Sequence, residues 1–315
     1  VSVVINNYNY AQFLSTAIES VLKQTYQKIE LIIVDDGSTD DSRSIITTYS
    51  NTAQTDSCHI VPIFQANGGH ASTFNTGFAA SNGEIICFLD ADDIFEPDKI
   101  EKIASAFESH PQAKWCFHTL KLFSTQTQTK LGVTWAFPKQ SEDPSGLYDF
   151  RDSIQQGHLN FYPPSTSGLC FQRQLLSKIL PMPAALHMAA DRYLVQSAII
   201  LSAGYFLQTP LTRQGIHGNN DCTMATTPSR EQKKGQNKIL LAYFLNAKFP
   251  KIWKFNHRTF ARGWSAVRRY GFDNAEIEQL AQQYLSSLSM IERMSIWIMS
   301  LYQNRPWKQV HLYRT

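Results

Sequence analysis

Three aspartates occupy four consecutive positions in the segment Asp90-Ala91-Asp92-Asp93, directly after the apolar run Ile85-Ile86-Cys87-Phe88-Leu89. The apolar run predicts a buried strand, and burying a carboxylate without a partner is costly. We therefore expect the acids to face the crevice at the carboxyl end of an open α/β sheet, where ligands bind. Oxygen ligands of this kind suit Mg²⁺ or Mn²⁺. The alternative is an acidic turn that caps a helix near Pro97.

A second acidic segment, Asp35-Asp36-Gly37-Ser38, follows the apolar run at 31–34. Its alternative interpretation is also structural, because Asp36 or Ser38 can cap the next helix. Two neighbouring parallel strands that both end in carboxylates nevertheless favour a binding site. One of these acids can accept a hydrogen bond from the imide N–H of uracil or from ribose hydroxyls.

Strands and helices alternate through the first 120 residues. Apolar runs predict strands at 1–5, 31–34, 60–64, 85–89 and 115–118, and helical spacing predicts helices at 11–24, 39–49, 70–80 and after Pro97. This alternation is typical of βαβ units in a mainly parallel sheet. The alternation stops at 121–165, where we expect a hairpin and loops. It returns with a strand at 168–171, a helix at 188–203 and a last strand at 204–207.

The composition, with 43% hydrophobic and 17% charged residues, is that of an ordinary globular protein. The five cysteines form no CxxC pair, which favours buried thiols in a reducing compartment. No apolar run approaches the roughly 18 residues that indicate a transmembrane helix. We therefore expect a cytoplasmic protein. Because Val1 lies within a predicted strand and is not Met, we expect a few residues to precede it.

Charge divides the chain in two. Residues 230–315 carry 15 Lys and Arg against 5 Asp and Glu, whereas residues 1–229 carry 14 against 21. We therefore predict an acidic α/β domain at 1–229 and a basic, aromatic-rich helical region at 230–315. The basic region contains Trp253, Trp264, Trp297 and Trp307.

Basic side chains interleaved with large aromatic ones suit peripheral contact with an anionic membrane, here the inner face of the cell membrane. The alternative is that the aromatic residues form a core and the charges form a solvated face. A nucleic-acid partner is not expected, because no nucleic-acid-binding motif accompanies the charge.

Several motifs together resemble the inverting glycosyltransferases of family 2, which have the GT-A fold. They are Asp35-Asp36-Gly37-Ser38 and Asp90-Ala91-Asp92-Asp93, with residues 1–9, 20–25, 75–77 and 83–86 in the order and spacing of that family. The resemblance is close from residue 1 to about 110 and looser over 160–220. It implies a GT-A fold at 1–229: a Rossmann-like, mainly parallel sheet with helices on both faces, followed by the helical C-terminal region.

The resemblance also implies a donor site. The nucleoside would be held by polar residues at the ends of the strands: Asn6, Tyr8, Asp36 and Asp90. Asp92 would bind Mn²⁺ or Mg²⁺, with Asp93 in support. Such a cation offsets the negative charge that develops on the diphosphate as the sugar leaves.

Inversion requires a general base on the face opposite the leaving group. The family places this base in a Glu-Asp pair at the start of a helix. The matching segment here is Ala189-Ala190-Asp191-Arg192-Tyr193, so Asp191 is the predicted base and Ala190 replaces the glutamate. The alternative is an aspartate that only stabilises the helix dipole.

The segment from Arg213 to His217 resembles the Arg-x-x-x-His segment that follows the last strand in the family. Arg213 would bind diphosphate through its fork of donors, and His217 would be a metal ligand or a diphosphate donor. Ser165-Thr166-Ser167-Gly168 resembles the acceptor-side strand entry, although a turn with hydroxyl caps gives the same pattern. His70 either binds phosphate at a helix start or caps that helix, and we assign it no role.

The sequence therefore predicts an inverting, metal-dependent transfer of sugar from a nucleotide-sugar donor, with UDP as the first choice. The acceptor would be a hydroxyl of a glycan or lipid-linked molecule in polysaccharide or glycolipid synthesis. The alternative is a non-catalytic nucleotide-sugar-binding protein of the same fold, which Ala190 supports. A nucleotidyltransferase would also use paired acids and a metal, but it lacks the context of Gln24-Thr25 and Asp35-Asp36-Gly37-Ser38.

Overall fold

A computed structural model describes residues 1–53, 57–127, 129–134, 136–137, 144–187, 189–217, 227–302 and 313–314. The chain forms two compact units. The first comprises the described residues of Val1–Asp149, Asn160–His217 and Leu312–Thr315, and the second comprises those of Phe150–Leu159 and Gly218–His311. The predicted functional domains, 1–229 and 230–315, stay a prediction.

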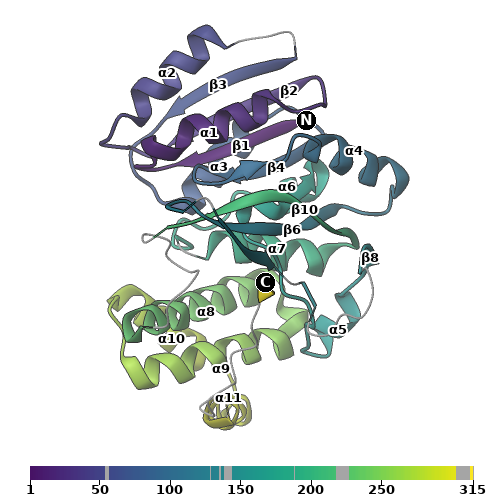
Figure 1. The fold of residues 1–315 in the computed structure, drawn as a ribbon. Helices are drawn as coiled ribbons and strands as arrows, with labels where there is room; N and C mark the ends of the chain where they lie inside the picture. Colours follow the sequence, from purple (N-terminus) through teal and green to yellow (C-terminus); the bar gives the residue numbers. More distant parts are fainter. Residues whose placement is uncertain are drawn as a thin grey trace. The chain divides into compact units, whose positions relative to one another are not determined.

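The first part of the sheet is parallel, as predicted (Figure 1). Its strands lie in the order β3-β2-β1-β4, and their bounds are β1 (Ser2–Asn7), β2 (Ile29–Asp35), β3 (Cys58–Phe64) and β4 (Ile85–Asp90). The connecting helices are α1 (Ala11–Leu22), α2 (Ser42–Thr52) and α3 (His70–Ala80). The register pairs Val4 of β1 with Ile32 of β2 on one side and with Phe88 of β4 on the other.

The rest of the sheet is mixed. Strand β9 (Leu169–Gln172) lies between β4 and β6 (Trp115–Ser124) and runs antiparallel to both. Strand β7 (Lys130–Thr134) forms the predicted hairpin with β6 and pairs with β11 (Tyr313–Arg314). Strand β10 (Gly204–Ile216) runs parallel to β6 and antiparallel to β5 (Ile94–Phe95) and β8 (Gly146–Tyr148). The remaining elements of this unit are α4 (Lys99–Ser109), the short 3₁₀ helix η1 (Thr166–Gly168), α6 (Arg173–Ile179) and α7 (Ala190–Leu201).

Two boundaries differ from the sequence-based expectation. Strand β10 does not end at 207 but continues to Ile216, because its second half pairs with β6 and β5. The expectation that Arg213 follows the last strand was therefore wrong, since Arg213 lies within it. Helix α7 begins at Ala190, and the predicted start at Met188 lies outside the described residues.

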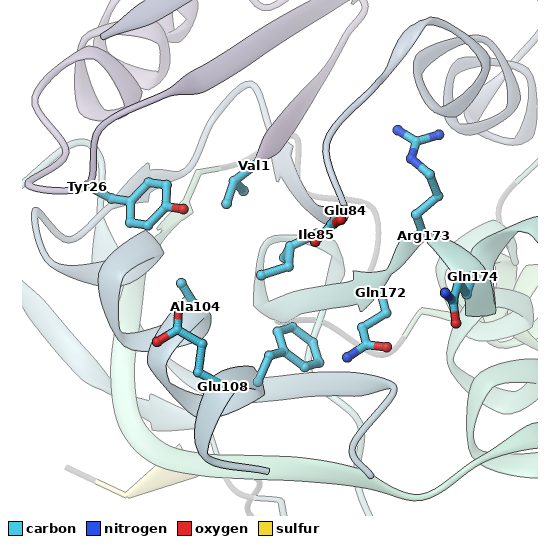
Figure 2. A pocket seen from close by; sticks show the side chains of 10 residues that line it. Val1, Tyr26, Glu84, Ile85, Ala104, Glu108, Gln172, Arg173 and Gln174 are labelled. Carbon is cyan, nitrogen blue, oxygen red and sulfur yellow. The ribbon is translucent and has the colours of Figure 1, made fainter. Parts of the chain in front are cut away.

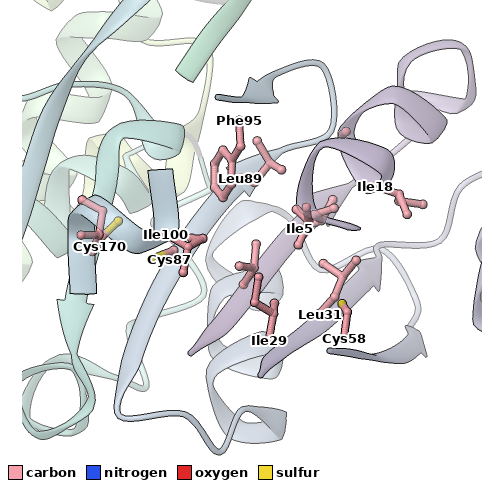
Figure 3. Close-up of a cluster of buried hydrophobic side chains, with 14 of the residues drawn as sticks. Ile5, Ile18, Ile29, Leu31, Cys58, Cys87, Leu89, Phe95, Ile100 and Cys170 are labelled. Atoms are coloured by element: carbon pink, nitrogen blue, oxygen red, sulfur yellow. The ribbon is translucent and has the colours of Figure 1, made fainter. Parts of the chain in front are cut away.

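One apolar core explains why these segments fold together. Ile5, Leu31 and Leu89 come from three adjacent strands and pack in a single cluster with Ile18 of α1 and Phe95 of β5 (Figure 3). Complete burial of each such side chain contributes about 1.5–3 kcal/mol. Four of the cysteines are buried thiols outside any disulfide in this unit, as predicted: Cys58, Cys87, Cys116 and Cys170. Cys222 lies outside the described residues.

A cavity of about 590 Å³ opens at the amino ends of the parallel strands (Figure 2). Its lining includes Val1 before β1, Glu84 before β4 and Arg173 at the start of α6. Because β1 and β4 run parallel, Asn6 and Asp90 lie at the opposite ends of these strands. The cavity is therefore not the site that the sequence motifs predict.

The second unit is helical, as expected for the C-terminal region. It contains α5 (Arg151–Gln155), α8 (Pro228–Lys248), the 3₁₀ helix η2 (Pro250–Ile252), α9 (Trp253–Tyr270), α10 (Ala275–Ser286) and α11 (Met290–Tyr302). Its core includes Phe260 of α9 stacked on Tyr284 of α10, with ring centroids 4.3 Å apart and planes 8° apart. None of the described helices combines the length and the apolar character needed to cross a membrane.

The alternative that the aromatic residues form a core holds in part, and membrane contact stays a prediction. Trp264 packs against the core of the second unit, whereas Trp253 and Trp297 are 47% and 50% exposed. Trp307 lies outside the described residues. The aromatic residues of this region therefore divide between core and surface.

Gly204 and Gly146 offer a matched test of packing, because they lie in the same β8–β10 ladder. A Cβ on Gly204 would overlap the ring of the fully buried Trp115, whereas a Cβ on Gly146 would meet only the Tyr148 ring edge at 4.0 Å. We expect Gly204→Ala to lower the free energy of unfolding by about 1–3 kcal/mol, the usual cost of overpacking. Gly146→Ala should change it by less than about 0.5 kcal/mol. Urea unfolding measures both, and equal midpoints for the two variants would contradict this packing.

Candidate functional site

Three strand ends bring the predicted site residues to one edge of the sheet. Strand β1 ends at Asn6 and Asn7, β2 at Asp35 and β4 at Asp90. The register places Asn6 directly beside Asp90 and Asn7 directly beside Asp35. The carboxyl ends of parallel strands are where open α/β sheets bind ligands.

The acidic cluster, defined as Asp90, Asp92 and Asp93, lies at the end of β4. One carboxylate oxygen from each residue lies within 4.8 Å of those of the other two. Burial, together with repulsion from Asp90, raises the pKa of Asp92 to about 6. Burial, together with repulsion from Asp92 and Asp90, holds the pKa of Asp93 well above its usual range. A set of carboxylate oxygens at this spacing fits a hard divalent cation, whose charge would offset the repulsion.

His217 lies beside this cluster, as the sequence predicted. Its Nε2 is 2.9 Å from Oδ2 of Asp92. The ring stacks on Phe13 of α1 with centroids 5.0 Å apart and meets Tyr10 edge-on. The imidazole is therefore held at the cluster by aromatic packing as well as by Asp92, and its role as a metal ligand stays a prediction.

Arg213 points toward a different partner. Its Nε is 3.3 Å from Oε1 of Glu96, and Lys121 Nζ is 3.0 Å from the same oxygen. Glu96 therefore forms ion pairs with Arg213 of β10 and Lys121 of β6. The Arg213 side chain is 48% exposed, so part of it remains accessible. Its predicted contact with diphosphate stays a prediction.

Asp36 is buried and anchors the loop between β3 and α3. Its Oδ1 accepts hydrogen bonds from Gln65 Nε2 at 2.6 Å and from the backbone N–H of Gly68 at 2.9 Å. Its Oδ2 accepts from the N–H of Gly69 at 2.8 Å. Gly69 has φ of +77°, a conformation that glycine adopts without strain. Asp36 thus fixes the start of α3.

That start presents His70, a residue to which the sequence assigned no role. Its Nε2 lies 3.4 Å from Asn6 Nδ2 and 3.6 Å from Asp90 Oδ1, and its ring stacks on Phe74. Burial lowers the pKa of His70, but the carboxylates of Asp90, Asp191 and Asp36 raise it, and the net shift is upward. The Gly68-Gly69-His70 segment marks the start of a helix in the sequence. It does not show whether His70 contacts a ligand or only caps that helix.

Asp191 lies in the first turn of α7 with its side chain 22% exposed. Its Oδ1 accepts from the backbone N–H of Arg192 at 2.6 Å. Its negative charge also contributes to raising the pKa of His70. Ala190, by contrast, is fully buried. A glutamate at position 190 would have to bury its carboxylate, so alanine fits the local packing.

Tyr8 follows β1 and is 47% exposed, which leaves its ring accessible to a ligand. Ser167, from the predicted acceptor-side segment, is fully buried instead. Its hydroxyl oxygen accepts from the backbone N–H of Asp90 at 3.0 Å. The acceptor role of this segment stays a prediction, but Ser167 itself supports the acidic cluster.

Lys99 also supports the acidic cluster, and nothing in the sequence indicated this role. It is fully buried, and its Nζ donates to the carbonyl oxygen of Ser167 at 2.8 Å and to Thr212 Oγ1 at 3.2 Å. Thr212 in turn donates to the same Ser167 carbonyl at 3.0 Å. One buried ammonium therefore links α4, η1 and β10 behind the acidic cluster.

We expect Lys99→Met to loosen the acidic cluster while leaving the fold intact. Methionine has a similar volume, and the Ser167 carbonyl oxygen keeps its hydrogen bond from Thr212 when the ammonium is removed. A displacement of about 1 Å in a site can cost about 10²-fold in turnover. Thermal unfolding and steady-state transfer kinetics measure the two effects. Lys102→Met, on the same helix but exposed and paired with Asp98, is the control, and identical kinetics in the two variants would contradict the supporting role.

Comparison with known proteins identifies relatives. The family model described as glycosyl transferase family 2 matches residues 2–172. An uncharacterised glycosyltransferase of Nostoc sp. (strain PCC 7120) is 40% identical over 238 residues, which are 75% of this chain and 71% of that protein. The glycosyltransferase GlyG of Streptococcus pneumoniae is 39% identical over 104 residues, which are 33% of each protein.

Solved structures show the same fold. TarS of S. aureus (residues 1–349) has a TM-score of 0.55 at 18% identity, over 96% of this chain and 79% of that chain. A mannosyltransferase of Pyrobaculum calidifontis has a TM-score of 0.50 at 14% identity, over 96% of this chain and 86% of that chain. At these identities the likeness establishes the GT-A fold alone.

Proposed function

The chain belongs to glycosyltransferase family 2, and we propose that it transfers a sugar, with inversion, from a nucleotide-sugar donor to an acceptor hydroxyl. The observation that carries the proposal is the position of the acidic cluster beside Asn6 and His70, at the carboxyl ends of the parallel strands. TarS has been solved with UDP and with UDP-GlcNAc, and the mannosyltransferase with GDP-Man and Mn²⁺. These complexes support a nucleotide-sugar donor, and a UDP-linked donor is our first choice.

Asn6, Tyr8 and Asp36 are the proposed nucleoside contacts. The Asp36 carboxylate already accepts three hydrogen bonds from the loop before α3. A carboxylate offers about four acceptor sites, so one remains for the imide N–H of a uracil. His70 and Arg213 are the proposed cationic contacts on the diphosphate side. His70 lies 3.6 Å from Asp90 of the acidic cluster, and the Arg213 side chain is 48% exposed.

Asp92, with Asp90, Asp93 and His217 around it, would hold Mn²⁺ or Mg²⁺. The donor set fits such an ion, because the carboxylate oxygens are close enough to share it. When bound, a divalent cation supplies positive charge that offsets the charge developing on the leaving diphosphate.

Asp191 is the proposed general base. It would take the proton of the acceptor hydroxyl as that oxygen forms a bond to the anomeric carbon and the bond from this carbon to the diphosphate oxygen breaks. Its partly exposed carboxylate leaves room for an acceptor. The acceptor itself, a glycan or a lipid-linked molecule of polysaccharide or glycolipid synthesis, is the least constrained part of the proposal.

Ala190 supports one alternative, a protein that binds a nucleotide sugar without turning it over. Hydrolysis assays over a panel of UDP- and GDP-sugars, with and without Mn²⁺, distinguish the two functions. Turnover of any donor supports the transferase. Binding of a donor without turnover, also in the presence of acceptor extracts, would favour the alternative.

The role of Asp92 is tested by Asp92→Asn. This change removes one charged ligand, which weakens cation binding and the stabilisation of the leaving group. We expect an intact fold and transfer reduced by at least about 10²-fold. Asp98→Asn is the control, because Asp98 directly precedes α4, its side chain is 44% exposed and it pairs with Lys102. Retained activity in Asp92→Asn, or full activity of the unchanged protein in EDTA, would refute the metal assignment.

The role of Asp191 is tested by Asp191→Asn. Loss of a general base should reduce turnover by about 10²–10⁴-fold while UDP and Mn²⁺ affinities stay close to those of the unchanged protein. Asp41→Asn is the control for a helix-start carboxylate, because Asp41 is exposed and directly precedes α2. Calorimetric titration and single-turnover kinetics separate the outcomes. A parallel loss of UDP affinity and turnover would remove Asp191 from the role of base.

A further inference from the structure

Helix α11 is apolar on two faces. Its inner face contributes Ile296 and Met299 to the core of the second unit, and the helix packs on α9. Its outer face is also apolar, with side chains between 40% and 84% exposed: Met290, Ile291, Met294, Trp297, Ile298, Leu301 and Tyr302. We call these seven residues the α11 apolar face. A contiguous exposed apolar patch of this kind marks an interaction site.

The spacing makes this face continuous. Positions 290, 294, 297 and 301 form one stripe of a helix, and 291, 298 and 302 form the stripe beside it. The two charged residues of α11 lie off the face and serve the start of the helix. Glu292 accepts from the backbone N–H of Ser289 at 2.8 Å, and Arg293 donates to the carbonyl oxygens of Leu288 and Ser286 at 2.9 and 3.0 Å.

The distribution of side chains on the face indicates what covers it. On a helical projection, Trp297 and Tyr302 occupy the two edges, and the aliphatic and Met side chains lie between them. Aromatic side chains at the edges suit the headgroup level of a bilayer, with the aliphatic residues deeper. In a protein interface, Trp and Tyr anchors instead concentrate near the centre of the patch.

The net charge of the helices α8 to α11 also favours a membrane partner. Residues 227–302 carry 12 Lys and Arg against 5 Asp and Glu. A basic unit is attracted to a surface of anionic lipids, and salt screens this attraction. An apolar face on a basic helical unit therefore fits an anionic membrane better than a neutral one.

We propose that α11 lies in the interfacial layer of an anionic bilayer, with the α11 apolar face inserted among the lipids. This narrows the membrane contact that the sequence suggested for 230–315 to one helix and seven side chains. It is independent of the transfer reaction, because α11 lies outside the unit that carries the acidic cluster.

The test is flotation of the full chain with vesicles of phosphatidylcholine and phosphatidylglycerol, compared with phosphatidylcholine alone. We expect the unchanged protein to float with the anionic vesicles at low salt and to be released in part at high salt. The double variant Met294→Glu/Ile298→Glu should bind at least about tenfold more weakly, because two inserted side chains become charged. Both positions are exposed, so thermal unfolding should be unchanged.

Gln279→Glu/Gln282→Glu is the matched control, because it makes the same charge change at exposed positions of α10. This control should float like the unchanged protein. Absence of flotation at low salt, or equal loss in both double variants, would overturn the proposal. So would a dimer in light scattering that Met294→Glu/Ile298→Glu disperses without any vesicle binding, which would assign the face to a second copy of the chain.

Discussion

Repulsion within the acidic cluster is the interaction around which the first unit is arranged. Three carboxylates within 4.8 Å of one another resist ionisation, so the surrounding structure must supply donors and positive charge. Gly215 of β10 donates its N–H to Asp93 at 3.0 Å, His217 contacts Asp92, and His70 lies beside Asp90. Gly215 and His217 both lie at the end of β10, and His70 lies at the start of α3. The acidic cluster therefore depends on the continuation of β10 past its predicted end.

The strand ends were predictable from the sequence for a simple physical reason. Runs of apolar residues define buried strands, and parallel strands place their carboxyl ends at one edge. The acids after β2 and β4 therefore lie at the same edge of the sheet. The expectation that these two strands are neighbours was wrong, because β1 lies between them. The family resemblance then predicted the fold, and the structure adds the register that pairs Asn6 with Asp90.

The support behind the site was not predictable, because it depends on contacts between distant segments. A lysine in a helix after a proline is normally exposed, yet Lys99 is buried by partners 68 and 113 positions away. The ion pair between Arg213 and Glu96 could not be predicted from the sequence either. Its guanidinium meets Glu96, which becomes its neighbour only because β10 pairs with β5 across Ile94.

The buried hydrogen bonds of Ser167 have an evolutionary consequence. Its hydroxyl holds the backbone of Asp90, and its carbonyl oxygen receives both Lys99 and Thr212. A change in the conformation of this turn would therefore displace the backbone of Asp90 and with it the acidic cluster. We therefore expect few substitutions at this turn. Substitutions that adapt the protein to new acceptors should instead accumulate in segments that share no hydrogen bond with β4.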